Sequence, residues 1–497
     1  MVAATDSRPL SFVEQPRDWQ LVVQALESLL DVERVMRRKE ELLVYECDGL
    51  TSYRERPAVV TLPRTAEEVA AVVRLCWEQD IPFVTRGAGT GLSGGALPLK
   101  DCVLIVTTCM QQILDIDYDN QQVVVEPGVI NNWITQAVSG EGFYYAPDPS
   151  SQLACSIGGN VAENSGGVHC LKYGVTTNHV LGLKVVLPNG EQVEVGGAVP
   201  EMPGYDLTGV FVGSEGTLGI VTEVTLRILK VAESVQVLLA DFTSVEAAGE
   251  TVSDVISAGI IPAGMEMMDN FSLNAVEDTV ATNCYPRDAI AILLIEIDGT
   301  PAEVAASAKQ IEALCNKNGA RQIIHATDPE ERLRLWKGRK AAFAAMGQIS
   351  PDYYVQDGVI PRTRLPEVLR EIEQLGEQHG YRVANVFHAG DGNLHPLILY
   401  NNAVPGELEA VEALGGDILK LCVRVGGSIS GEHGIGADKR CYMPNMFSKV
   451  DLKTMQWVRG AINKKGLANP TKIFPTPRTC GEAAQTHSGQ FSNLEKF

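Results

Sequence analysis

The chain has 497 residues, of which 45% are hydrophobic and 21% charged, a balance typical of packed globular domains. Its formal net charge of −21 disfavours nucleic acids and anionic membrane surfaces as partners. No apolar stretch reaches the roughly 20 residues that cross a bilayer, and no signal-peptide pattern opens the chain, so we expect a cytoplasmic protein without a transmembrane segment.

The 11 cysteines are scattered along the chain and contain no C-x-x-C pair. This pattern predicts reduced thiols rather than a disulfide framework or an iron–sulfur cluster. Any one-electron relay would therefore lie in another protein.

After an N-terminal helical segment, residues 1–54, the pattern predicts a first domain over residues 55–232. Residues 59–62 and 82–86 are predicted strands, and between them the capping box Thr65-Ala-Glu-Glu68 begins a helix with apolar residues at helical spacing. The second strand leads into Arg86-Gly-Ala-Gly-Thr-Gly-Leu-Ser-Gly-Gly95.

Five glycines in nine residues leave the backbone N–H groups of this loop open to a dinucleotide phosphate. Residues 89–94 formally satisfy G-x-G-x-x-G, but that fingerprint requires a following helix. Gly94, Gly95 and Pro98 come next, and residues 103–107 look like a strand. The sequence therefore predicts a phosphate loop between two strands rather than a Rossmann unit; the alternative is an ordinary glycine-rich turn.

Three further segments are rich in small residues: 147–151, 156–167 and 213–221, the last followed by a β-rich stretch to Ile228. A flat ligand could lie against such backbone. A strand is also predicted at 122–125.

From Val235 the order changes to strand, helix, strand, twice over, which is the ferredoxin-like β-α-β-β-α-β order with helices on one face. The six expected elements are 235–241, 245–258, 264–268, 289–297, 302–318 and 321–326. Helices are expected near 331–346, 364–378 and 410–425. We expect this cap domain over 233–425, a C-terminal segment completing the active site over 426–480, and a loose tail over 481–497.

Two histidines flank a predicted hairpin in His388-Ala-Gly-Asp-Gly-Asn-Leu-His395. If the strands pair symmetrically about Asp391-Gly392, His388 faces His395 with Cβ atoms roughly 4.5–5.5 Å apart. Two imidazoles at that separation can meet one divalent ion, and Glu432 in Ser430-Gly-Glu-His-Gly434 can add a carboxylate. The alternative is a surface histidine pair.

Long strings of the chain resemble one family. "VTRGAGTGLSGGALPL", "APDPSSQ", "CSIGGNVAEN", "GGVHCLKYG", "ISPDYY", "VANVFHAGDGN" and "GGSISGEHGIG" are similar to FAD-linked oxidases of the vanillyl-alcohol-oxidase type, in the branch of D-lactate, D-2-hydroxyglutarate and glycolate dehydrogenases. The likeness runs from about Tyr45 to Pro475 and is strongest to FAD subunits of glycolate dehydrogenases. It implies an α+β fold: a two-lobed FAD-binding domain (PCMH type) plus the ferredoxin-like cap.

The resemblance implies FAD as cofactor. Its expected contacts are Arg86, Gly87, Ala88, Gly89, Thr90, Gly91, Leu92, Ser93, Pro147, Asp148, Ser150, Ser151, Ser156, Gly159, Asn160, Gly216 and Ile220. Relatives with covalent flavin carry His where this chain has Thr90, which implies non-covalent FAD.

The resemblance also implies that His388, His395 and Glu432 are metal ligands. Zinc is the first choice, with manganese and iron compatible, because an N₂O donor set does not distinguish them. His433 is then the expected base that removes the hydroxyl proton as hydride leaves for the flavin. Arg339 matches the carboxylate-binding arginine of the relatives, and its planar fork suits that task.

The substrate prediction depends on Val355 and Phe343. Both stand where 2-hydroxyglutarate enzymes place polar residues, so a second substrate carboxylate would be left unpaired. We therefore expect oxidation of a small anionic 2-hydroxy acid, glycolate to glyoxylate first and D-lactate to pyruvate next. The acceptor would be an iron–sulfur or second flavin-type partner subunit, or quinone, which could hold the protein at a membrane periphery.

Three alternatives remain at this stage. They are a D-2-hydroxyglutarate dehydrogenase, a non-catalytic electron-transfer flavin subunit of a larger complex, and another flavoenzyme of this scaffold such as an aldonolactone oxidase.

Overall fold

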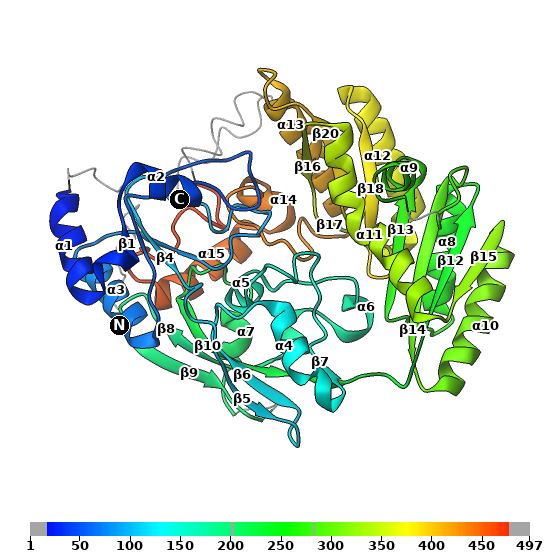
Figure 1. The fold of residues 1–497 in the computed structure, drawn as a ribbon. Helices are drawn as coiled ribbons and strands as arrows, with labels where there is room; N and C mark the ends of the chain where they lie inside the picture. The colour runs from blue at the N-terminus through cyan, green and yellow to red at the C-terminus, as the bar shows by residue number, and fades with distance from the viewer. Residues whose placement is uncertain (1–16, 200–202, 282–283, 477–497) are drawn as a thin grey trace.

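The structure, a computed structural model, describes residues 17–199, 203–281 and 284–476. Two lobes lie side by side in Figure 1, an N-terminal lobe and a cap lobe, joined by the strand that leads into β12. The predicted loose tail and the first 16 residues lie outside the described residues. The fold is α+β, as predicted.

A small sheet of order β1-β2-β4-β3 carries the glycine-rich loop. Its strands are β1 (Val35–Met36), β2 (Val59–Thr61), β3 (Phe83–Arg86) and β4 (Val103–Val106), next to α1 (Trp19–Leu29), α2 (Lys39–Leu42) and α3 (Ala66–Glu78). Strands β3 and β4 are parallel neighbours, and no helix lies between them in the chain. The rejection of a Rossmann unit is therefore confirmed.

The predicted capping box of α3 forms only in half. The side chain of Thr65 accepts a hydrogen bond from Glu68 N, but the Glu68 carboxylate accepts from Arg34 at 2.8 Å and from Arg64 N at 2.7 Å. A charged partner outcompetes the backbone N–H of Thr65 because hydrogen bonds between charged groups are stronger.

The second sheet of the N-terminal lobe is antiparallel, with order β5-β6-β10-β8-β9. Its strands are β5 (Ile113–Asp117), β6 (Gln122–Val125), β8 (Val180–Val186), β9 (Gln192–Gly196) and β10 (Ile220–Arg227); nearby are α4 (Asn131–Val138), β7 (Phe143–Tyr144), α5 (Ile157–Glu163), α6 (Cys170–Tyr173), α7 (Leu207–Phe211) and β11 (Leu229–Lys230). Alternate residues of β10 are buried, since side chains of a strand point to opposite faces.

The cap begins with the predicted ferredoxin-like unit, whose strands run in the order β15-β12-β14-β13. Its elements are β12 (Ser234–Phe242), α8 (Val245–Ser257), β13 (Gly264–Asp269), β14 (Ala291–Gly299), α10 (Pro301–Lys317) and β15 (Gln322–Ala326). Each predicted element of the unit is present, within a few residues of its expected bounds.

The cap sheet continues beyond this unit. The sequence did not predict this continuation of the sheet, but the three helices predicted near 331–346, 364–378 and 410–425 are present. The continuation adds β16 (Asp352–Val355), β17 (Gly358–Val359), β18 (Val383–His388), β19 (Asn393–Leu394) and β20 (Pro396–Tyr400), with α9 (Asn270–Val280), α11 (Pro329–Ile349), α12 (Leu365–His379) and α13 (Glu407–Arg424). Leu238 and Val237, neighbours in β12, belong to different apolar cores. The two helices of the ferredoxin-like unit, α8 and α10, both pack in the core of Leu238, so the expected single helical face of that unit is confirmed. Helices α9 and α11 cover the other face of the sheet.

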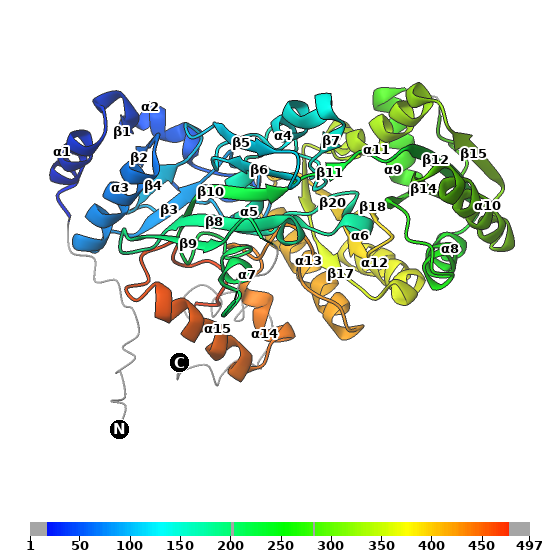
Figure 2. The same cartoon turned by 90° about the horizontal axis from the view of Figure 1, so that it is seen from below.

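The C-terminal segment returns to the N-terminal lobe. Figure 2 shows α14 (Met443–Met446) and α15 (Lys449–Ile462) beneath its sheets. Asn469 N donates to the carbonyl of Phe83 at 2.8 Å, while Ser428 N donates to the carbonyl of Val359 in the cap at 2.9 Å. This segment therefore contacts both lobes.

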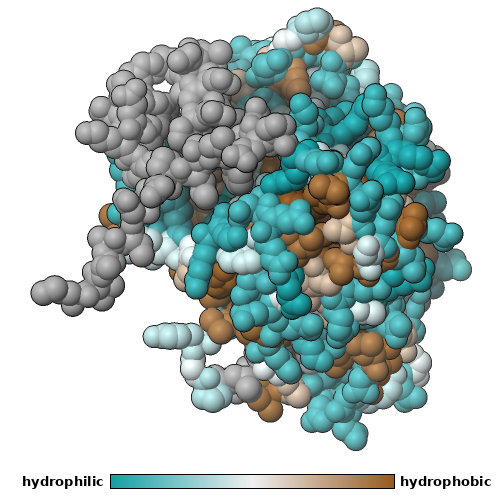
Figure 3. All heavy atoms as spheres, turned by 90° about the vertical axis from the view of Figure 1, so that its left-hand side faces the viewer, coloured by the Kyte–Doolittle hydropathy of each residue, from teal (hydrophilic) through white to brown (hydrophobic). Residues whose placement is uncertain are grey.

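One side of the molecular surface is largely polar. Figure 3 views the side where α1 and α3 lie, and hydrophilic side chains cover most of it, with separate apolar patches between them. Among the described helices, none combines the length and apolar character needed to cross a bilayer. One expectation needs correction: Cys441 is disulfide-bonded, so the cysteines are not all reduced thiols.

Helix α11 contains one glycine that packs closely against a neighbouring side chain and one that does not, so the effect of a glycine-to-alanine change on stability can be compared at the two positions. A Cβ on Gly338 would lie 2.6 Å from the hydroxyl of the buried Tyr285, whereas a Cβ on Gly347 would meet nothing within 4 Å. Alanine gains about 1 kcal/mol of helix propensity over glycine, but overpacking a core costs about 1–3 kcal/mol. We expect Gly338→Ala to lower the melting temperature and Gly347→Ala to raise it. Equal shifts of the two variants in thermal unfolding would contradict the packing of Tyr285 against α11.

Candidate functional site

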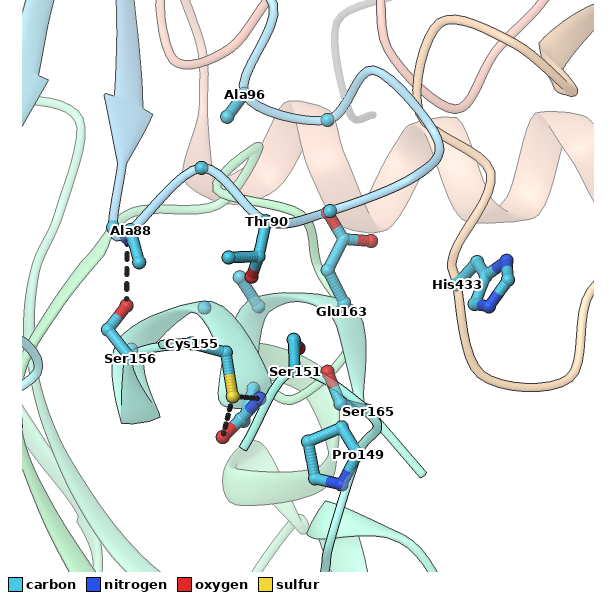
Figure 4. Close-up of a pocket in the computed structure, with 18 of the residues that line it drawn as sticks. Ala88, Thr90, Ala96, Pro149, Ser151, Cys155, Ser156, Glu163, Ser165 and His433 are labelled. Carbon is cyan, nitrogen blue, oxygen red and sulfur yellow. Dashed lines mark hydrogen bonds between the residues drawn. The ribbon is translucent and has the colours of Figure 1, made fainter. Parts of the chain in front are cut away.

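A cavity of about 490 Å³ extends from the glycine-rich loop to the residues around His433. Its walls come from the loop after β3, residues 149–151, α5, residues 214–216 and the start of β10. Helix α11, β16 and the loop at 432–433 close the other end. Figure 4 shows the glycine-rich loop facing α5, with His433 across the cavity. The cavity is thus shared by the N-terminal lobe, the cap and the C-terminal segment.

Glycines allow the loop to approach α5. A Cβ on Gly87 would collide with the hydroxyl of Ser156, and the neighbouring N–H of Ala88 donates to that hydroxyl at 3.2 Å. A Cβ on Gly91 would meet only Glu163, at 3.9 Å. The loop therefore packs on one side and leaves bare backbone toward the cavity, which suits a pyrophosphate.

Most of the predicted cofactor residues line this cavity. They are Gly87, Ala88, Gly89, Thr90, Gly91, Leu92, Ser150, Ser151, Ser156, Gly159, Asn160, Gly216 and Ile220. Residues far apart in the sequence thus form one surface of small and polar groups. Such a surface fits FAD.

Four predicted cofactor residues lie behind the cavity wall instead. Arg86 Nη1 donates to the carbonyl of Cys47 at 2.5 Å, and Asp148 pairs with His169 at 3.0 Å. The carbonyl of Pro147 accepts from Asn131, and that of Ser93 accepts from Ala437 N and Asp438 N. These residues hold the wall in place.

The three predicted metal ligands converge. Oε1 of Glu432 lies 3.0 Å from Nε2 of His395 and 3.3 Å from Nε2 of His388, and the three ligand atoms fall within 4.8 Å of one another. His395 Nδ1 is buried without a hydrogen-bond partner in the described structure. Two imidazole nitrogens and one carboxylate oxygen around a common point fit a divalent ion.

The predicted hairpin register is wrong, although His388 and His395 lie close together as that register implied. His388 pairs with Asn393, not with His395, and Asn385 pairs with Pro396. The four residues Ala-Gly-Asp-Gly form the turn, so the register slips by two residues. Because side chains alternate with a period of two, this slip leaves both histidines on one face as diagonal neighbours, with ring centroids 5.0 Å apart.

Arg339 is tied to a buried carboxylate below the metal ligands. Its Nε and Nη2 lie 2.7 and 2.6 Å from Oε2 of Glu266, whose Oε1 lies 2.7 Å from Nδ1 of His388. Arg339 is 2% exposed and does not line the cavity. Its expected role in binding the substrate carboxylate is therefore not supported by this geometry; it holds Glu266, which orients His388.

The charges of the ligands are coupled. Burial alone would lower the pKa of His388, but Glu266 and Glu432 outweigh it and raise that pKa well above its usual range. Burial would raise the pKa of Glu432, but His388 and His395 bring it well below its usual value. A metal ion must displace the proton from His388, so ion binding competes with protons.

Asp357 anchors the loop that carries Glu432 and His433. Its buried carboxylate accepts from the backbone N–H groups of Gly431 at 3.0 Å, Glu432 at 3.2 Å and His433 at 2.9 Å. Lys439 Nζ donates to it at 3.1 Å. Burial raises its pKa, but Lys439 and the neighbouring histidines outweigh burial, so the pKa lies below the usual range.

His433 is held as a neutral imidazole. Its ring stacks on His395 with centroids 5.0 Å apart and planes inclined by 8°. Burial lowers the pKa of His433 to about 4, so it is unprotonated at neutral pH. An unprotonated imidazole in a cavity wall can accept a proton.

The cap end of the cavity carries a single cation. Lys340, Phe343, Ala344 and Tyr353 line it, and Lys340 is the only Lys or Arg among the described lining residues. Val355 packs in the cap core rather than on the cavity wall. Phe343 therefore faces the cavity, as its substrate role requires, and Val355 does not.

Four acidic residues of the site were not predicted from the sequence: Glu266, Asp357, Glu163 and Glu215. Glu266 had a signal: it is a lone charged residue in the apolar stretch Gly264–Met268 of a predicted strand, where a charge must find a buried partner. Asp357 follows β16 with no local pattern. Its partners in the loop at 430–433 are more than 70 residues away.

The cavity and its residues agree with two protein families. The family described as FAD binding domain matches residues 57–196, and the one described as FAD linked oxidases, C-terminal domain, matches residues 231–473. FAD is thus the cofactor of the N-terminal lobe.

Relatives along the whole length support this. Glycolate oxidase subunit GlcD of Escherichia coli (strain K12) is 50% identical over 480 residues, 96% of each chain. The subunit of the same name from Bacillus subtilis (strain 168) is 38% identical over 87% of this chain and 92% of its own. D-lactate dehydrogenase of Anaerostipes hadrus is 34% identical over 84% and 90%.

Among solved structures, 4-ethylphenol oxidase from Gulosibacter chungangensis is similar with a TM-score of 0.78, covering 93% of this chain and 98% of that one at 17% identity. p-Cresol methylhydroxylase has a TM-score of 0.76 at 17% identity, with coverages of 92% and 96%. These structures share the fold, a two-lobed FAD-binding domain of the vanillyl-alcohol-oxidase type with a cap. With the matching families and relatives, they show that the chain belongs to the FAD-linked oxidases.

Proposed function

We propose that this FAD-linked oxidase oxidises a small 2-hydroxy acid, glycolate to glyoxylate first and D-lactate to pyruvate next. The observation that carries the proposal is the single cavity that joins the glycine-rich loop to His395, Glu432 and His433. The names of the relatives, glycolate oxidase subunit and D-lactate dehydrogenase, agree with it.

FAD would lie along residues 87–92, with further contacts from 150–151, 156–160, 216 and 220. When bound, it supplies the acceptor for the hydride that leaves the hydroxy-bearing carbon. Thr90 has no ring nitrogen with which to form a flavin linkage, so the cofactor is held without a covalent bond.

His388, His395 and Glu432 would hold a divalent ion, for which zinc is the first choice and manganese or iron is compatible. When bound, the ion supplies a positive charge that acidifies the substrate hydroxyl. Glu266 accepts from Nδ1 of His388 and so presents Nε2 to the ion, the usual outer partner of a ligating histidine.

His433 is the proposed base. Its Nε2 lies 3.8 Å from Oε1 of Glu432, so this nitrogen points toward the ligand set and is the one we assign to accept the hydroxyl proton. Asp357 holds the backbone N–H of His433, which keeps the imidazole in place while the proton moves.

Lys340 is the proposed partner of the substrate carboxylate, in place of Arg339. It is the one Lys or Arg among the described cavity-lining residues, whereas Glu266 neutralises Arg339. Phe343 and Tyr353 leave an apolar surface beside it. A diacid such as 2-hydroxyglutarate would place its second carboxylate on that surface unpaired, which is costly.

Electrons would leave toward a partner. Two of the relatives are named glycolate oxidase subunits. We propose iron–sulfur or second flavin-type subunits, or quinone, as acceptors, with the protein in the cytoplasm or bound to a membrane through them. The assembled set of His388, His395, Glu432 and His433 favours a catalytic chain over a purely electron-passing one.

We propose that the chain divides into an N-terminal helical segment (1–54), an FAD-binding domain (55–232), a cap domain (233–425), a C-terminal segment (426–480) and a tail.

The substrate assignment is tested by steady-state assay of the purified protein with an artificial dye. Glycolate or D-lactate should give the highest kcat/KM, and D-2-hydroxyglutarate should be turned over poorly. Lys340→Met should raise KM for glycolate roughly 10-fold or more, since a hydrogen bond to a charged group contributes about 1.5–3 kcal/mol.

Lys337→Met is the matched control for Lys340, because Lys337 lies in the same helix and does not line the cavity. Faster turnover of D-2-hydroxyglutarate than of both monoacids would overturn the substrate class. If Lys340→Met leaves the KM for glycolate unchanged, another residue binds the substrate carboxylate.

Prolonged chelation should remove activity while FAD stays bound, and a divalent ion should restore it. His395→Ala should reproduce the chelated state, whereas His325→Ala, which changes a half-exposed histidine of β15, should keep both metal and activity. Elemental analysis that finds active protein without metal would defeat the metal site.

His433→Gln should keep FAD and metal but slow flavin reduction by roughly 10²–10⁴-fold, the usual contribution of a positioned base. Stopped-flow bleaching of the flavin by substrate measures this step alone. If the variant reduces its flavin at a rate within about threefold of wild type, the loss is far smaller than a positioned base contributes. His433 would then have a structural role.

A further inference from the structure

The carboxyl group of Glu163, in the N-terminal lobe, also lines the cavity. Glu163, the last residue of α5, lines the cavity between the glycine-rich loop and the loop of His433, as Figure 4 shows. A Cβ on Gly95 would collide with its Oε1, and a Cβ on Gly434 would collide with its Oε2. Both loops therefore leave room for this side chain.

Glu163 lacks the donors that a buried carboxylate needs. Its Oε2 is buried and has no hydrogen-bond partner in the described structure. Ionising the carboxyl would leave this shielded oxygen without a donor, which is costly. A protonated carboxyl would instead present an O–H donor to whatever occupies the cavity.

The neighbouring carboxylate of Glu215, unlike that of Glu163, has hydrogen-bond donors for both of its oxygens. Its two oxygens accept from the backbone N–H groups of Ile435 and Gly436, each at 2.7 Å. Burial raises the pKa of Glu215, but these two donors oppose burial and favour the ionised form. Glu215 thereby holds the loop of His433 to the N-terminal lobe, and its negative charge acts on Glu163.

The charged groups that face Glu163 come from three other parts of the chain. Burial raises its pKa well above the usual value, and the nearby Glu215 and Asp48 raise it further, while Lys439 and Lys472 oppose them. Burial also lowers the pKa of Lys472, to about 8, which weakens that opposition as the pH rises. The balance favours the protonated form of Glu163.

We propose that Glu163 binds FAD as a protonated carboxyl that donates a hydrogen bond to the cofactor, while ionised Glu215 holds the His433 loop. FAD is rich in acceptors, in its phosphates, ring carbonyls and ring nitrogens, and Glu163 is the carboxyl at the junction of the cofactor loop and the loop of the proposed base. The inference rests on FAD binding and is independent of the substrate and of the metal.

The test is a titration of the FAD-depleted protein with FAD, followed by flavin fluorescence, at several pH values. Because FAD binds the protonated form, wild-type Kd should rise with pH above the pKa of Glu163 in the FAD-depleted protein, by up to tenfold per pH unit, roughly the slope for uptake of one proton. Glu163→Gln keeps an N–H donor and cannot ionise, so its Kd should stay near the low-pH wild-type value across the range.

Two further variants isolate the donor. Glu163→Leu has a similar size and no donor, so we expect FAD affinity about 10-fold or more below that of Glu163→Gln at every pH, since a lost hydrogen bond costs that much. Glu194→Gln changes an exposed carboxylate of β9 and should retain the wild-type slope. Thermal unfolding of each variant confirms that the fold is kept.

Either of two results overturns the proposal. One is a Glu163→Gln variant whose Kd rises with pH as steeply as that of wild type. The other is a Glu163→Leu variant that binds FAD as tightly as Glu163→Gln.

Discussion

The Asp357 carboxylate is the interaction on which the site depends. It is fully buried and accepts from three successive backbone N–H groups of the loop at 431–433. Asn393, from the strand before His395, also donates to it, at 2.8 Å. One ionised group thus joins the loop that carries Glu432 and His433 to the hairpin that carries His388 and His395. Because a buried charge is costly unless it is fully hydrogen-bonded, any movement of the loop would leave Asp357 unsatisfied.

The site lies where three parts of the chain meet, and carboxylates join them. Glu266 connects α11, through Arg339, to His388. Glu215 connects the N-terminal lobe to the loop after His433, and His169 pairs with Asp148 in its own lobe and Glu296 in the cap. A protein with net charge −21 therefore gathers acidic groups around its cavity and compensates them with backbone N–H groups, histidines and a few buried lysines. Among the described residues that line the cavity, Lys340 is the one Lys or Arg.

The sequence predicted elements better than contacts. The ferredoxin-like unit, the loop between β3 and β4 and the approach of His388 to His395 follow from periodicity and turn chemistry, which are local. The hairpin register was wrong by two residues because Gly390 and Gly392 allow a longer turn, and Gly392 has φ of +81°. His388 and His395 nevertheless lie on one face of the hairpin, because a register slip of two residues leaves each side chain on the same face. The pairing of Arg339 could not be predicted for a different reason: its partner Glu266 is 73 residues away, and a single helical arginine gives no sign of what it pairs with.

The sequence by itself determined the class of cofactor, the family and the residue types of the proposed metal site, because glycine spacing and long family-specific strings specify a backbone shape and a donor set. Only the tertiary structure decided which residues face the cavity. Arg86, Ser93, Pro147 and Asp148 stand in the same motifs as the lining residues, yet lie behind the wall. The positions of Lys340, Glu163 and Val355 depend on how helices and strands from separate parts of the chain pack, and side-chain direction relative to a cavity is fixed by that packing rather than by neighbours in sequence.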